Sequence, residues 1–203
     1  MFRRRAWYVM AFLALAVAIY ALVLPVVPAL QAPFVRERFV TIPLFIYAHF
    51  LGSAVALGVG PFQFLASVRA RALNVHRWMG RLYVGGVALG GLGGLVMATI
   101  SMGGPVAHVG FALLAVLWVG TAGAAYLAIR EGDATRHRRW VTRSYALALA
   151  AVTLRIELPL MLVAGMSFDV AYPFVAWLCW VPNLLVAEWR FMPVPARPRS
   201  APA

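Results

Sequence analysis

Lysine is absent from this chain of 203 residues, acidic residues are few, and cysteine occurs once. All 18 basic residues are arginines, against six Asp or Glu, which gives a formal net charge of +12. The single thiol, Cys179, excludes an intrachain disulfide and a cysteine-based metal cluster. The exclusive use of arginine indicates base-composition bias in the encoding genome rather than a mechanism.

Sequence motifs typical of soluble enzymes are also absent. The sequence contains no HExxH zinc motif, no P-loop, no nucleophile elbow and no Rossmann glycine pattern after a strand. The run Gly90-Gly91-x-Gly93-Gly94 lies inside an apolar stretch, so it cannot form a nucleotide-binding loop. The basic charge reflects membrane topology, and we expect no nucleic-acid partner.

Long apolar stretches are what the chain has instead. It is 64% hydrophobic and 12% charged, whereas soluble domains are nearer half apolar and a quarter charged. Each stretch reaches the roughly 20 residues that a helix needs to cross a bilayer. The sequence therefore predicts an all-α polytopic membrane protein, with a single six-helix transmembrane domain over 1–190. The expected spans are 7–30, 41–66, 78–101, 106–129, 141–165 and 170–189.

Arginine placement predicts the orientation of these spans. With the N-terminus inside, 15 of the 18 arginines fall in inner segments, and only Arg36 and Arg38 fall in outer ones. We therefore expect both termini in the cytoplasm and the chain in the bacterial inner membrane, in contact with the lipid bilayer. Residues 191–203, rich in Pro, Ala and Arg, are expected to form a disordered cytoplasmic tail. The first span also has some features of a signal peptide, but it is longer than usual.

Four histidines form two pairs with nearly equal spacing. His49 and His108 fall near the outer ends of the second and fourth spans. His76 and His137 fall at the inner starts of the third and fifth. At about 1.5 Å per helical residue, the two levels are roughly 20–25 Å apart. Each pair is thus expected at one face of the membrane.

A weak internal repeat supports this pairing. The stretch from His76 to Tyr83 resembles the stretch from His137 to Tyr145 with one residue inserted. The second and third spans therefore look like a copy of the fourth and fifth. Two such hairpins would form a central four-helix bundle around an axis along the membrane normal, and equivalent histidines would face each other across it.

A planar tetrapyrrole fits between two facing imidazoles, because haem iron accepts axial histidines. The sequence thus predicts two b haems whose iron is bound by His49 with His108 and by His76 with His137. The glycine-rich third span suits either a flat ring or close helix packing. Each histidine alone could instead be structural, capping a helix or touching a headgroup. The tryptophans, Trp118 and Trp180 among them, are interpreted mostly as interfacial residues.

Several arginines are candidate cofactor-binding residues. Arg77, Arg81, Arg138 and Arg143 surround the inner histidines, where they could clamp haem propionates or simply contact lipid phosphates. Arg155 lies within the fifth span, where a charge is costly and is expected to face the bundle. Glu157 is two positions away and on another helix face, so a simple ion pair between the two is not expected.

Two resemblances follow from these residues. Gln63, the stretch His76-Arg77-x-x-Gly80-Arg81-x-Tyr83, the stretch from His137 to Tyr145, Arg155, Pro182-Asn183 and Glu188 resemble a bacterial family of predicted multi-span membrane proteins without an assigned activity. Separately, the helix and histidine layout is similar to the ascorbate-reducible two-haem transmembrane cytochrome b family. That likeness implies six helices and two b haems, with ligands from helices two and four and from helices three and five. His76 and His137 depart from it by lying closer to the interface, and no ascorbate site is implied.

The sequence is compatible with two functions. The first is transmembrane electron transfer by a di-haem cytochrome, with a quinone or small reductant and a membrane partner subunit as candidate partners, as in a quinol or ferric reductase. The alternative is a haem-free membrane protein, such as a transporter, a lipid-binding protein or a subunit of a complex.

Overall fold

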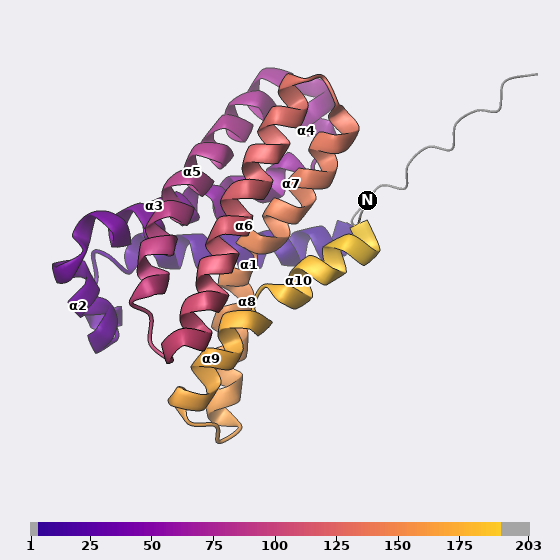
Figure 1. Cartoon of the computed structure of the whole chain (residues 1–203). Helices are drawn as coiled ribbons and strands as arrows, with labels where there is room; N and C mark the ends of the chain where they lie inside the picture. The colour runs from indigo at the N-terminus through magenta and orange to yellow at the C-terminus, as the bar shows by residue number, and fades with distance from the viewer. Residues whose placement is uncertain (1–3, 192–203) are drawn as a thin grey trace, which may run out of the picture.

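The computed structural model describes residues 4–191, and within that range it contains only helices (Figure 1). The predicted all-α fold is therefore confirmed. The tail expected over 191–203 lies, beyond its first residue, outside the described residues. The elements are α1 (Arg4–Val23), η1 (Pro28–Leu30), α2 (Pro33–Thr41), α3 (Pro43–Gln63), α4 (Ala66–Arg71), α5 (Leu73–Thr99), α6 (Gly104–Arg130), α7 (Ala134–Ala148), α8 (Ala150–Val163), α9 (Phe168–Leu178), α10 (Val181–Val186) and η2 (Ala187–Phe191).

Six helical segments of the described chain are long and apolar enough to cross a membrane, as the sequence predicts. They are Arg4–Val23, Pro43–Gln63, Leu73–Thr99, Gly104–Arg130, Ala134–Val163 and Phe168–Arg190. The first ends earlier than expected, because prolines at 25 and 28 cannot continue a helix. The third and fifth begin earlier, since helix extends into the polar residues before the apolar run. His76 and His137 consequently lie in the first turns of their helices.

Two of the six segments are interrupted. The fifth divides into α7 and α8 at Leu149, and the sixth divides into α9 and α10 at Cys179–Trp180. Pro182 explains the second break, because its ring would clash with the carbonyl one turn earlier. At the start of α7, the Asp133 side chain accepts a hydrogen bond from the Arg136 amide at 2.8 Å and caps the helix.

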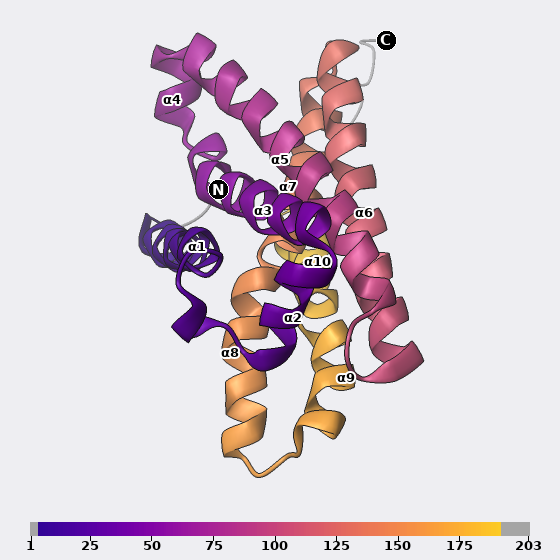
Figure 2. The ribbon, with the colours of Figure 1, turned by 90° about the vertical axis from the view of Figure 1, so that its left-hand side faces the viewer.

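The helix α1 runs across the bundle rather than along it. It lies across the view in Figure 1 and is seen end-on in Figure 2, turned by 90°. Near its start, the Trp7 indole donates a hydrogen bond to the carbonyl of Pro61 in α3 (3.0 Å). Its later residues contact α8 as well as α3. The first span therefore braces two parts of the bundle from outside.

The four central helices form a ring. Helix α5 packs against α3 and α6, and α7 packs against α6 and α3. The pairs α3 with α6 and α5 with α7 make no extensive contact within residues 4–191, so they lie diagonally across the ring. The predicted four-helix bundle is thus present, and each predicted histidine pair comes from one diagonal.

Glycines bring α3 and α5 very close together. A Cβ on Gly86 would lie 2.7 Å from the Gly52 carbonyl oxygen, and a Cβ on Gly90 would lie 2.8 Å from the Ser53 amide nitrogen. Only hydrogen at these positions allows the two backbones to touch. The glycine-rich span therefore serves helix packing, and it also presents glycine to the centre of the ring.

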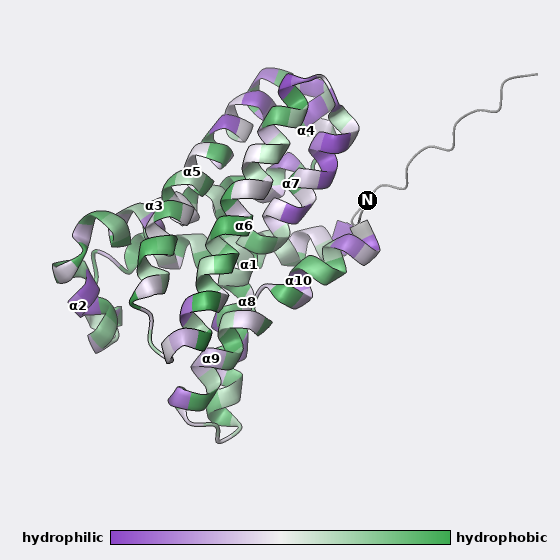
Figure 3. Cartoon of the chain, viewed as in Figure 1, coloured by the Kyte–Doolittle hydropathy of each residue, from purple (hydrophilic) through white to green (hydrophobic). Residues whose placement is uncertain are grey.

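Charged residues gather at one end of the bundle. Figure 3 shows hydrophilic residues around α4 and the beginning of α7, while the middles of the central helices are largely hydrophobic. We call this end the inner end, after the orientation that the arginines predict, and we call the opposite end, which carries α2, the outer end.

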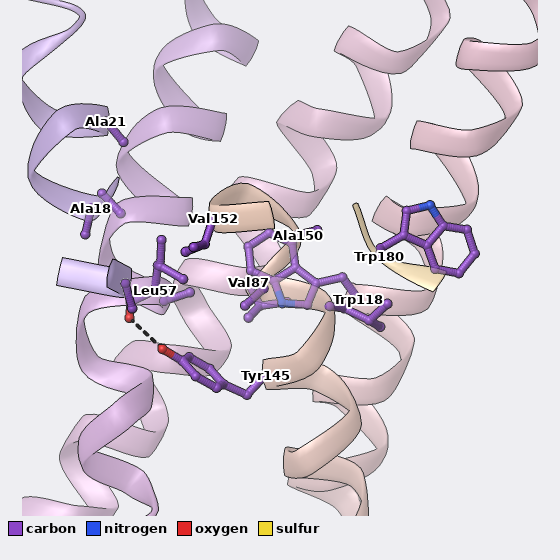
Figure 4. Close-up of a cluster of buried hydrophobic side chains, with 14 of the residues drawn as sticks. Ala18, Ala21, Leu57, Val87, Trp118, Tyr145, Ala150, Val152 and Trp180 are labelled. Atoms are coloured by element: carbon purple, nitrogen blue, oxygen red, sulfur yellow. Dashed lines mark hydrogen bonds between the residues drawn. The ribbon is translucent and has the colours of Figure 1, made fainter. Parts of the chain in front are cut away.

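The inner half of the ring is filled by two tyrosines from equivalent repeat positions. The Tyr83 hydroxyl lies 2.8 Å from the Ser144 hydroxyl, and the Tyr145 hydroxyl donates to the Leu57 carbonyl at 3.2 Å (Figure 4). Their ring centroids are 6.3 Å apart. These contacts join α3, α5 and α7, so the weak sequence repeat corresponds to side chains that meet in space.

Candidate functional site

A cavity of about 330 Å³ occupies the outer half of the ring. It forms because α8 packs against α9 and α1, which leaves the space beside α3, α5 and α6 open. Helix α2 contributes residues at its outer side. The volume lies at the lower end of the range typical of small-molecule sites, about 300–1,000 Å³.

The cavity has an apolar wall with a cationic and hydrogen-bonding component. Its charged lining residues are Arg155 and Arg38, and no Asp or Glu is among the described residues that line it. Ser53 also lines it, and the Ser53 hydroxyl is buried without a hydrogen-bond partner in the described part of the chain. Unpaired buried polar atoms are rare and call for an explanation. A ligand with hydrogen-bond acceptors and an apolar body would supply one.

His49 presents one ring nitrogen for a further partner. Its Nδ1 lies 2.8 Å from the Gly90 carbonyl oxygen, which can only accept, so Nδ1 carries the proton. The lone pair is then on Nε2, the arrangement found in metal-binding histidines whose other nitrogen donates to a carbonyl. His49 lines the cavity together with Gly90, Gly91 and Gly94.

His108, the predicted partner of His49, lies outside the cavity wall that His49 lines. His108, in the first turns of α6, lies with its Nε2 2.8 Å from the Ser101 carbonyl oxygen. Its Nε2 therefore carries the proton and holds the loop before α6. His108 is not among the described residues that line the cavity.

The inner pair is brought together. His76 of α5 and His137 of α7 are close enough to interact electrostatically. His137 Nδ1 donates to the Ala125 carbonyl at 2.8 Å, which leaves its Nε2 with a lone pair, as in His49. His76 Nδ1 is buried without a partner among the described residues. Gln63 lies beside this site, because its amide donates to the His76 carbonyl at 3.4 Å.

The four inner arginines have separate environments. Arg77 and Arg138 are exposed. Arg81 lies over the Trp78 ring, with its guanidinium carbon 4.7 Å from the centroid. Arg143 forms a two-pronged ion pair with Glu188 of η2 and lies 4.6 Å above the Trp140 ring. Arg143 therefore ties the end of the sixth span to α7 in this structure.

Arg155 lines the cavity, and its guanidinium forms no ion pair with a carboxylate of the described residues. One guanidinium nitrogen donates to the Ala151 carbonyl at 2.9 Å, and the group lies 5.0 Å from the centroid of the Tyr20 ring. Its charge is close enough to act on His49. The described residues show no ion pair between Arg155 and Glu157, as expected from their spacing. Glu157 keeps one carboxylate oxygen buried and unpaired within the described chain.

The sequence interpretation missed Trp118, Arg38 and Ser53 in the cavity wall. Trp118 and, outside the wall, Trp180 are buried at 7% and 6% exposure, so the expectation that they are interfacial is wrong for both. Trp118 lies at the middle of its span, and that position was a signal against an interfacial role. Arg38 and Ser53 were not singled out, because a short outer helix and one serine give no periodic pattern.

Metal binding by side chains alone has no support in the described residues. No group of three or more His, Cys, Asp or Glu side chains lies together there. An axial pair on a haem needs only two histidines, so this finding leaves the haem interpretation untested.

Comparison with known proteins identifies the family. A family model described as Predicted membrane protein (DUF2306) matches residues 46–191. The chain belongs to this family. The DUF2306 match begins in α3 and runs to η2, so it includes both histidine pairs, Arg155 and most of the cavity wall. It confirms the first resemblance, whereas the likeness to two-haem cytochromes stays a prediction. Comparisons with curated proteins and with solved structures gave no match.

Proposed function

We propose that this protein is a b-type cytochrome that moves electrons across the membrane between an outer and an inner haem. The observation that carries the proposal is the ring of four helices. Each pair of candidate ligands comes from diagonally opposed helices, His49 with His108 from α3 and α6, and His76 with His137 from α5 and α7. Imidazoles on opposed helices can approach a group at the centre of the ring from both faces.

The residues around the outer cavity fit a haem in two respects. The lone pair of His49 Nε2 is available, because the Gly90 carbonyl accepts a hydrogen bond from Nδ1. Arg155 lines the same cavity and would offer a positive charge to a carboxylate. Haem, when bound, supplies one-electron chemistry at its iron, and the chain holds and shields it.

His108 would have to change its contact to hold haem iron together with His49. Its Nε2 donates to the Ser101 carbonyl, and that hydrogen bond would first have to break. The Ser101 loop that follows α5 is short, with Gly103 and Gly104 both at positive φ (84° and 67°). At the inner site, His137 is already oriented by Ala125 and lies near His76.

A haem-free function is the second candidate, and the chemistry of the cavity wall is the observation that favours it. An apolar cavity with two arginines and an unpaired serine hydroxyl suits an amphipathic anion, and His49 could then bind that ligand by a hydrogen bond. A transporter or lipid-binding protein would use such a site.

The visible spectrum of the purified protein separates the two candidates. We expect a b-type spectrum whose bands sharpen on dithionite reduction, with about two haems per chain in material from haem-supplemented cells. A colourless protein that stays colourless after haem is added would contradict the cytochrome proposal and leave the haem-free candidate.

The orientation of the chain can be tested independently. A reporter fused at the C-terminus is expected to signal from the cytoplasm, because 15 of 18 arginines lie on that side in the proposed topology. A periplasmic signal would contradict the assignment of inner and outer ends.

A further inference from the structure

We propose that Arg155 is an anion anchor, and that the outer cavity prefers ligands that bring a carboxylate to it. This inference rests on the proposed function for the identity of one ligand, haem, whose propionates are carboxylates. It goes beyond that function by naming the group that the cavity selects.

The Arg155 guanidinium is only partly hydrogen-bonded by the described residues. A guanidinium carries several N–H donors, and the described structure gives Arg155 one hydrogen bond, to the Ala151 carbonyl. The Tyr20 ring contributes a cation–π contact at 5.0 Å. Neither partner is negatively charged. A cation within a membrane-spanning segment is costly unless it is paired or serves a pathway.

The described residues give the cavity wall a net positive charge. Arg155 and Arg38 line it, and no acidic residue does within the described chain. Arg38 already donates to the Ile100 carbonyl (3.1 Å) and has Glu37 nearby at 3.7 Å. Arg155 is thus the cation without a counter-charge, in contrast to Arg143, whose partner is Glu188.

A further donor belongs to the same cavity wall. Ser53 lines the cavity, and its buried hydroxyl has no hydrogen-bond partner among the described residues. Apart from His49 and Ser101, the remainder of the wall is mostly aliphatic and aromatic. A ligand with an anionic head and an apolar body satisfies both Arg155 and Ser53, and a neutral apolar ligand satisfies neither.

The test compares ligands that differ only in the carboxylate. The purified full-length protein is titrated with haem b and with haem b dimethyl ester by absorbance, and with oleate and methyl oleate by competition against a fluorescent fatty acid. We expect the free acids to bind at least about tenfold more tightly than their esters, the order expected for a charge-assisted hydrogen bond. Arg155→Gln should abolish the preference, and Arg155→Lys should retain most of it.

A control variant tests whether the effect is specific to Arg155, and the outcomes distinguish the anchor proposal from the cytochrome proposal. Arg71→Gln removes an exposed arginine outside the cavity, at a residue with no proposed role in binding, and should preserve the preference. Equal binding of acid and ester to the native protein, or an unchanged preference in Arg155→Gln, would overturn the anchor. If haem binds without a carboxylate preference, the cytochrome proposal survives and the anchor fails. If oleate binds through Arg155 and haem does not bind, the anchor survives and the cytochrome proposal fails.

Discussion

The inner and outer halves of the four-helix ring contain the same two repeated hairpins, yet the inner half is filled and the outer half is hollow. In the inner half, Tyr83 and Tyr145 meet at the centre, and hydrogen bonds to Ser144 and Leu57 fix them. In the outer half, α8 turns toward α9 and α1 and leaves a cavity of about 330 Å³. The break at Leu149 marks the change. A repeat in sequence therefore supplies two similar hairpins, and the direction of one helix decides where a cavity forms.

This difference predicts an order of haem binding. Limiting haem should fill the outer site first, because its cavity already exists, whereas the inner side chains must separate. His49→Ala should remove nearly all binding at low haem, and His76→Ala should leave it intact. Absorbance titration of the two variants checks this. Equal loss in both, or full haem content in both, would contradict the comparison.

The glycine contact between α3 and α5 supports both halves, and its loss should have a large effect on folding. A Cβ on Gly52 would overlap the backbone of Gly90 and Gly86. We expect Gly52→Ala to lower the free energy of unfolding by about 1–3 kcal/mol, the usual cost of overpacking. Unfolding of the purified protein in mixed detergent micelles measures this free energy.

Gly85→Ala is the matched control for this variant. It lies on α5, the helix that packs against α3 at Gly52, and a Cβ there would meet nothing within 4 Å. It should be neutral or slightly stabilising, since alanine favours helix over glycine. A Gly85→Ala protein as unstable as Gly52→Ala would show that helix approach is not the cause.

The smallest effect is expected from the inner tyrosine. Tyr83→Phe removes the hydrogen bond to Ser144 and keeps the ring, so the free energy of unfolding should fall by about 0.6 kcal/mol, typical of such bonds between membrane helices. Tyr8→Phe, at a residue that is 64% exposed, should change nothing measurable. A large loss of outer ligand binding in Tyr83→Phe would show that the two halves are coupled.

The sequence predicted the fold well because its strongest signals are those that a bilayer imposes. Span length and hydropathy gave six helices, and the repeat gave the central bundle. Helix ends were less accurate, since Leu73 and Ala134 begin helices in polar sequence that hydropathy places outside a span.

The site was predicted only in part. The placement of Arg155 toward the bundle followed from the cost of a membrane charge, and the closeness of His76 and His137 followed from the repeat. The contact of His108 with Ser101 and the pairing of Arg143 with Glu188 depend on how a loop and a distant helix pack, and residue spacing carries no information on either.

Electron transfer across a sealed vesicle tests the central claim most directly. Protein reconstituted with haem into vesicles that enclose ferricyanide should bleach it when an impermeant reductant is added outside, and His49→Ala and His137→Ala should each abolish the reaction while the vesicles stay sealed. Such a result requires both levels to act in series. Haem-loaded native protein that leaves the enclosed ferricyanide oxidised, or that transfers electrons equally well in both variants, would contradict the account.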